Sequence, residues 1–140
     1  MQQDFTYLRR LLTETHPGLY RYTPKVKMQS KLDSIYNLLD RRLPFYEFYK
    51  IITVLVSDIR CAHTNALPSA NFNGYISSIK SFPFFMFPIG GKLYVIFNGS
   101  TDTQVTLGYE LTRINGHPVD SVIRVIKRHY WSDGFIESSK

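Results

Sequence analysis

The chain of 140 residues has only one cysteine, Cys61, so no disulfide can form within it and a disulfide-stapled scaffold is excluded. Its four histidines have no paired spacing and no cysteine pair accompanies them, which argues against a zinc site. The most apolar stretch, residues 45–59, is too short and too interrupted by charge to cross a bilayer. We therefore expect no metal, no other cofactor and no membrane span.

The chain also lacks a continuous basic run, although its formal net charge is +6. The basic residues are scattered, with isolated pairs at positions 9–10, 41–42 and 127–128. No recognised nucleic-acid-binding module accompanies them, so solvated helix faces explain the charge better than a nucleic-acid partner. The first ten residues contain no apolar run of the kind that forms a signal peptide.

Apolar and aromatic residues are abundant. Hydrophobic residues make up 44% of the chain and include ten Phe and ten Tyr, which is enough for a bulky packed core. The longest apolar pattern recurs at steps of three and four and therefore predicts a buried helix. Its members are Phe45, Phe48, Ile52, Leu55 and Ile59. This helix leads directly into the turn Cys61-Ala62-His63-Thr64.

Two further helices are predicted before it. Residues 3–15 are amphipathic and stop at His16-Pro17-Gly18, because the residue before a proline avoids helical geometry. Thr23 and Pro24 then indicate a capping hydroxyl followed by a proline in the first turn of a helix that runs to about Arg41. Tight links between three helices predict an N-terminal three-helix bundle over residues 1–64.

The second half of the chain is β-like. Residues 65–78 form a predicted loop or linker, since residues 65–74 are polar and rich in turn formers. Residues 79–140 then form a small, mostly antiparallel β-sheet with one helix, in which Gly90-Gly91 predicts a hairpin and Asn115-Gly116 a tight turn. Asp120 or Ser121 is the predicted N-cap of this helix. The predicted fold class is α+β, and no closing element is visible from Gly134 onward, as if the chain stopped before a further domain.

Three stretches carry a family resemblance: DFTYLRRLLTETHPGLYRYTP, IRCAHT and GYELTRINGHPVDSVI. Together they resemble the N-terminal region of the carboxy-terminal processing (tail-specific) serine peptidases, which include the tricorn core, over nearly the whole chain. The resemblance implies a helical bundle, then a PDZ-like segment, then an α/β catalytic domain that supplies the nucleophile. It also implies a peptide or protein substrate and a periplasmic or extracellular location. The usual glycine-rich carboxylate loop of PDZ domains is not evident.

His63 matches the position of the general base in tricorn-like members, and it is the one catalytic residue the resemblance assigns to this chain. Histidine suits that task because its ordinary pKa lies close to neutral pH. Alternatively, His63 caps the C-terminus of its helix. No glycine-flanked serine is present, and Ser138 and Ser139 lack neighbouring glycines. We therefore expect a non-catalytic fragment that is inactive alone.

Other interpretations stay open. The chain is alternatively a stand-alone PDZ-like peptide- or protein-binding module, or a basic anion-binding protein. A dyad of Cys61 with His63 is weak, because residues two apart rarely face each other. His16 is expected to make a turn hydrogen bond, His117 to be exposed and His129 to cap a helix.

Overall fold

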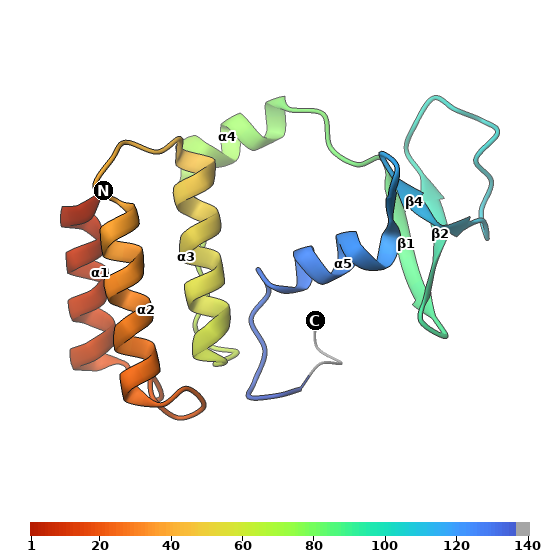
Figure 1. The fold of residues 1–140 in the computed structure, drawn as a ribbon. Helices are drawn as coiled ribbons and strands as arrows, with labels where there is room; N and C mark the ends of the chain where they lie inside the picture. Colours follow the sequence, from red (N-terminus) through yellow and green to blue (C-terminus); the bar gives the residue numbers. More distant parts are fainter. Residues whose placement is uncertain (137–140) are drawn as a thin grey trace. The chain divides into compact units, whose positions relative to one another are not determined.

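The computed structural model describes residues 1–136 and confirms the α+β class (Figure 1). Across these residues the chain forms five helices and two small antiparallel sheets. They fall into two compact units, one of residues 1–67 with the segment from Lys127 onward, the other of Pro68–Ile126. None of the described helices is both long enough and apolar enough to span a membrane.

The first unit contains α1 (Gln2–Thr15), α2 (Lys25–Leu38) and α3 (Phe45–Ile59), as Figure 1 shows. All three helices contribute to one hydrophobic cluster, which also includes side chains from the links between them. Each fully buried member stabilises the fold by about 1.5–3 kcal/mol. The cluster consists of Phe5, Leu12, Leu19, Met28, Leu32, Ile35, Leu39, Leu55 and Ile59.

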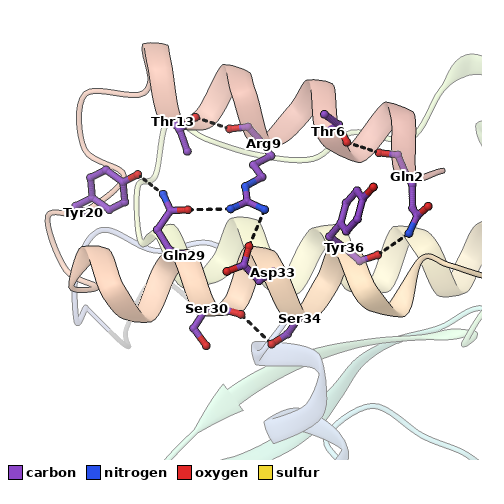
Figure 2. Close-up of polar contacts among 10 residues, drawn as sticks. All are labelled: Gln2, Thr6, Arg9, Thr13, Tyr20, Gln29, Ser30, Asp33, Ser34 and Tyr36. Atoms are coloured by element: carbon purple, nitrogen blue, oxygen red, sulfur yellow. Dashed lines mark hydrogen bonds and ion pairs between the residues drawn. The ribbon is translucent and has the colours of Figure 1, made fainter.

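Polar contacts join α1 to α2 along their solvent side (Figure 2). Arg9 lies at the centre, with Nη1 2.7 Å from Asp33 Oδ1 and Nη2 donating to Gln29 Oε1 at 3.1 Å. Near the other end of the pair, Gln2 Nε2 donates to the carbonyl of Tyr36 at 3.2 Å. Because Asp33 is exposed and Arg9 is only half-buried, the pair contributes about 0–1 kcal/mol, and burial rather than charge holds the two helices together.

The start of α2 differs from the sequence prediction. Pro24, not Thr23, is the N-cap residue, and no side chain caps the helix. The Thr23 hydroxyl instead donates to the carbonyl of Asp58 at 3.2 Å, near the end of α3. The predicted capping role of Thr23 is therefore wrong, because its hydroxyl accepts no amide of α2 and donates to a distant carbonyl instead. The hydroxyl links the start of α2 to the end of α3.

The second unit contains α4 (Ala70–Ser78), β1 (Phe84–Ile89), β2 (Lys92–Asn98) and β3 (Glu110–Leu111), and the last three pair in the order β1-β2-β3. β4 (Arg113–Ile114) pairs with β5 (His117–Pro118), and α5 (Val119–Lys127) follows. Both predicted turns are confirmed, because Gly90, Gly91, Asn115 and Gly116 all have positive φ. Positive φ at both central residues is what a tight antiparallel hairpin requires.

Helix α4 is a correction to the predicted loop or linker over residues 65–78. The Ser69 side chain accepts a hydrogen bond from the Phe72 amide at 3.4 Å, which is the N-cap interaction of α4. The helix forms despite Gly74 and two asparagines, and none of its side chains is buried. A local cap therefore decides the conformation here, where the composition alone favours turns. The predicted cap of α5 is also wrong, because the helix begins at Val119 and Asp120 and Ser121 lie in its first turn.

Candidate functional site

The site is built around the C-terminal end of α3. The helix stops at Ile59 because Arg60 adopts a left-handed conformation, with φ 58° and ψ 44°. This conformation costs a residue other than glycine roughly 1–2 kcal/mol and needs support from its surroundings. Two contacts provide that support: the Arg60 carbonyl accepts from the Gly134 amide at 3.0 Å, and its guanidinium lies 4.0 Å from the ring centre of Phe135.

Residues 128–136, called the strap below, continue this contact along α3. The Ser57 hydroxyl, on a 6% exposed side chain, donates to the carbonyl of Tyr130 at 2.6 Å. Asp133 Oδ1 accepts from the amide of Ala62 at 3.1 Å, in the turn that follows the helix. Residues 134–136 form no helix or strand, but they lie against this helix end through the Gly134 amide and the Phe135 ring. Ser138 and Ser139 lie outside the described residues.

The structure places His63 on the turn held by these contacts. The amide of Thr64 donates to the carbonyl of Cys61 at 3.0 Å and closes the turn, and His63 is exposed. The alternative that His63 caps α3 is wrong, because Arg60 occupies the cap position. Within residues 1–136 the His63 ring makes no hydrogen bond or ion pair. It lies at an open hollow of about 420 Å³ lined by His16, Pro17, Gly18, Arg21, Cys61, His63 and Thr64.

His16 supports the same turn from the end of α1. Its Nδ1 accepts the Gly18 amide at 3.1 Å, which confirms the predicted turn hydrogen bond. In the neutral ring the other nitrogen then carries the proton, so Nε2–H donates to Thr64 Oγ1 at 2.8 Å. Both ring nitrogens are occupied, and His16 has no free lone pair with which to accept a proton. It acts as a pin between the end of α1 and the turn of His63.

Cys61 also lines this hollow. Its side chain is half-buried and packs against the hydrophobic cluster of the helical unit. In the described part of the chain, no hydrogen bond joins its sulfur to His63. A small apolar filler is therefore the role its surroundings support, as free buried cysteines usually have.

His129, predicted to cap a helix, makes a tertiary contact instead. It lies two residues beyond the end of α5, and its Nδ1 is 2.9 Å from Thr53 Oγ1 on α3. The Thr53 hydroxyl already donates to the carbonyl of Lys50 at 2.9 Å, so Nδ1–H is the donor and Nε2 keeps its lone pair. Burial lowers the pKa of His129 below its usual 6.5, and the charges of Arg128 and Lys50 lower it further. This pair forms because the strap lies against α3, and the sequence alone does not predict it.

The remaining histidine, His117, is exposed on β5, as predicted. Over residues 1–136 no three His, Cys, Asp or Glu side chains come together in a way that could hold a metal ion. Chemistry at the candidate site therefore rests on the free imidazole of His63, its pinned neighbour His16 and the guanidinium of Arg21 at the same hollow.

Comparison with known proteins gives no relative from which function can be transferred. No protein-family model, no curated protein and no solved structure matches this chain.

Proposed function

We propose that this chain is the N-terminal region of a serine peptidase of the tail-specific, tricorn-like kind, and that His63 is the general base of the reaction. In this proposal α1, α2 and α3 form the family's helical bundle, and the second unit is its PDZ-like segment. The parent protein is periplasmic or extracellular and cleaves peptides or proteins. The observation that supports this most strongly is an exposed imidazole, without a partner in residues 1–136, on a turn held from two sides.

The chemistry requires such an arrangement. A general base must have a free nitrogen and must be held in place while it takes the proton of the attacking hydroxyl. His63 meets both conditions, because His16 supports its turn through Thr64 and Asp133 supports it through the Ala62 amide. The serine Oγ–H would give its proton to the free nitrogen of His63 as Oγ attacks the carbonyl carbon. The serine and the oxyanion donors come from residues outside this chain.

The natural coding sequence tests the proposal. A glycine-flanked serine should be encoded within about 250 residues after Lys140, which is the length of one domain. A reading frame that encodes no such serine over that distance would contradict the proposal. Residues 1–140 alone should show no peptidase turnover, since they lack the nucleophile. Activity that stayed with the purified chain through every chromatographic step would also count against it.

A second candidate is a PDZ-like module that binds peptides by adding a strand. β1 lies at the edge of the sheet, and Phe85 and Phe87 on it are 67% and 54% exposed. A hollow of about 430 Å³ in the same unit is lined by Ile89, Tyr94, Val95, Ile96, Leu107 and Gly108. An extended peptide pairing with such an edge gains main-chain hydrogen bonds, and neighbouring apolar hollows select its side chains.

Titration with a panel of fluorescent peptides tests this second function. Saturable binding at about micromolar concentration, lost when Phe85 and Phe87 are replaced by serine, would support a binding module. The matched control replaces Tyr7 and Val26, which are also exposed but lie on the helices of the other unit. If no peptide binds more tightly than about 1 μM, or −8.2 kcal/mol, the module hypothesis loses its support.

A further inference from the structure

A hollow with a cationic rim lies in the helical unit, between α2, α3 and the start of the strap. Its volume is about 390 Å³, which falls in the range of roughly 300–1,000 Å³ typical of small-molecule sites. Apolar side chains form one part of its wall and basic side chains the other. The lining residues of this cationic hollow are Lys31, Ile35, Lys50, Ile51, Val54, Leu55, Arg128 and His129.

The charges around the hollow are only partly neutralised. Lys31 is paired with Asp58 of α3. Lys50 and Arg128 have no carboxylate partner anywhere in residues 1–136, although Lys50 Nζ lies 5.2 Å from the ring centre of Tyr46. Both cations are exposed, and both act electrostatically on the same imidazole, that of His129. Two unpaired like charges therefore converge on one apolar hollow and produce a local positive potential.

The apolar part of the hollow belongs to the helices. Ile51 and Val54 of α3 are only partly buried, so the hydrophobic cluster behind them does not cover them completely. Ile35 of α2 is 7% exposed and Leu55 is 0% exposed, so they form the floor. An apolar chain in the hollow would remove the surface of Ile51 and Val54 from water, at about 25 cal/mol for each Å² covered.

We propose that the cationic hollow binds an amphipathic monoanion, a carboxylate with a short unbranched hydrocarbon chain. The chain would lie against Ile51 and Val54, and the carboxylate would accept hydrogen bonds from Lys50 and Arg128. Charge complementarity selects the anion, because an ammonium head group would be repelled and a neutral one would leave both cations unpaired. The cationic hollow shares no lining residue with the hollow at His63, so the proposed binding does not depend on the proposed peptidase function.

Isothermal titration of the 140-residue chain with decanoate tests the proposal, with decanol and acetate as matched probes that lack the charge or the chain. We expect one decanoate per protein, about tenfold weaker binding of decanol, and no measurable binding of acetate. The double substitution Lys50→Gln/Arg128→Gln should weaken decanoate binding by about tenfold or more. Both side chains are exposed, so the fold should tolerate the change, which circular dichroism checks.

The matched control is Lys27→Gln/Arg41→Gln, which removes the same two charges from exposed positions outside the hollow. It should leave decanoate affinity within about twofold of the parent, since distant surface charges are screened. Bound decanoate should also raise the pKa of His129, followed by its ring proton shifts in NMR, because an anion offsets the nearby cations. The proposal is overturned if decanoate does not saturate, if decanol binds as tightly, or if both double variants lose affinity equally.

Discussion

Replacing Gly134 with alanine tests whether the strap lies on the end of α3 as described. Gly134 has φ 56°, and a left-handed conformation costs an alanine roughly 1–2 kcal/mol. Alanine also reduces the conformational entropy of the unfolded chain, which offsets about 0.4–1 kcal/mol of this cost. The new Cβ would also lie 3.0 Å from Cε1 and Cζ of Tyr22, a contact too short for either group. Overpacking of this kind costs about 1–3 kcal/mol.

Together these terms predict that Gly134→Ala weakens docking of the strap by about 1–5 kcal/mol. Gly90→Ala is the matched control for the backbone term, because Gly90 has φ 57° and nothing lies within 4 Å of an added Cβ. It should cost its own hairpin only about 1 kcal/mol. Gly134→Ala combined with Tyr22→Leu separates the steric term, since the double-mutant cycle should recover about 1–2 kcal/mol.

Trp131 makes the measurement direct, because the only tryptophan of the chain lies in the strap. Its fluorescence during urea unfolding should report the loss of docking in Gly134→Ala. Hydrogen exchange should show faster exchange of the Ala62 and Gly134 amides, which bond to Asp133 and to Arg60 across the contact. If Gly134→Ala leaves the Trp131 transition and both amides unchanged, the strap does not dock on α3 in this way.

Three further predictions concern the helical unit. Leu55→Ala should lower the free energy of unfolding, measured by urea titration, by about 2–5 kcal/mol, because the Leu55 side chain is 0% exposed. The control Leu11→Ala, at a 40% exposed position, should lower it by less than about 1 kcal/mol. Because the pKa of His129 is lowered in the folded protein, the unfolded chain binds the proton at a higher pH. The contribution of neutral His129 to the free energy of unfolding is therefore present above pH 6.5 and is lost as pH falls through the folded-state pKa. Lys50→Gln should raise the pKa of His129 in an NMR titration, and an unchanged value would contradict the electrostatic cause. His16→Ala removes both hydrogen bonds of the pinned ring and should cost about 1–2 kcal/mol by urea unfolding; a neutral effect would mean that the pin does not form in solution.

The sequence predicts the helices of the first unit well where apolar residues recur at helical spacing and where residues such as proline mark a helix end. The steps of three and four in residues 45–59 locate α3, and Pro44 and Arg60 bound it. The glycine pair at 90–91 and the Asn115-Gly116 turn are predictable too, because few residues accept positive φ. These signals are local, so they need no knowledge of what packs against them.

The features that sequence reasoning misses depend on partners distant along the chain. Thr23 has the sequence context of a helix cap, yet its acceptor is Asp58, 35 residues away. The pairs of Ser57 with Tyr130 and of Thr53 with His129 span 73 and 76 residues. Single serine, threonine and histidine side chains form no periodic pattern in the sequence. Their distant hydrogen-bond partners therefore cannot be identified from spacing. The strap is therefore found only in the structure.

The site is predicted only as far as the chemistry of single residues allows. The sequence places His63 in the turn after the third helix, although that helix is buried only toward its C-terminal end, and it predicts the hydrogen bond of His16 within its own turn. The second bond of His16, to Thr64, joins α1 to the turn after α3 and is not visible from spacing. It also distinguishes the two imidazoles at this hollow, since His16 has partners at both ring nitrogens and the His63 ring has none in residues 1–136.

The role of His63 is tested most directly by fluorophosphonate labelling of the protein expressed from its complete natural reading frame. Labelling rates of the parent are compared with those of His63→Ala and of His117→Ala, since His117 is also exposed and lies on β5. The proposal predicts one labelled serine, a rate that falls by about 10²–10⁴-fold in His63→Ala, and no change in His117→Ala. A protein that takes up no label, or one labelled equally fast without His63, would contradict it.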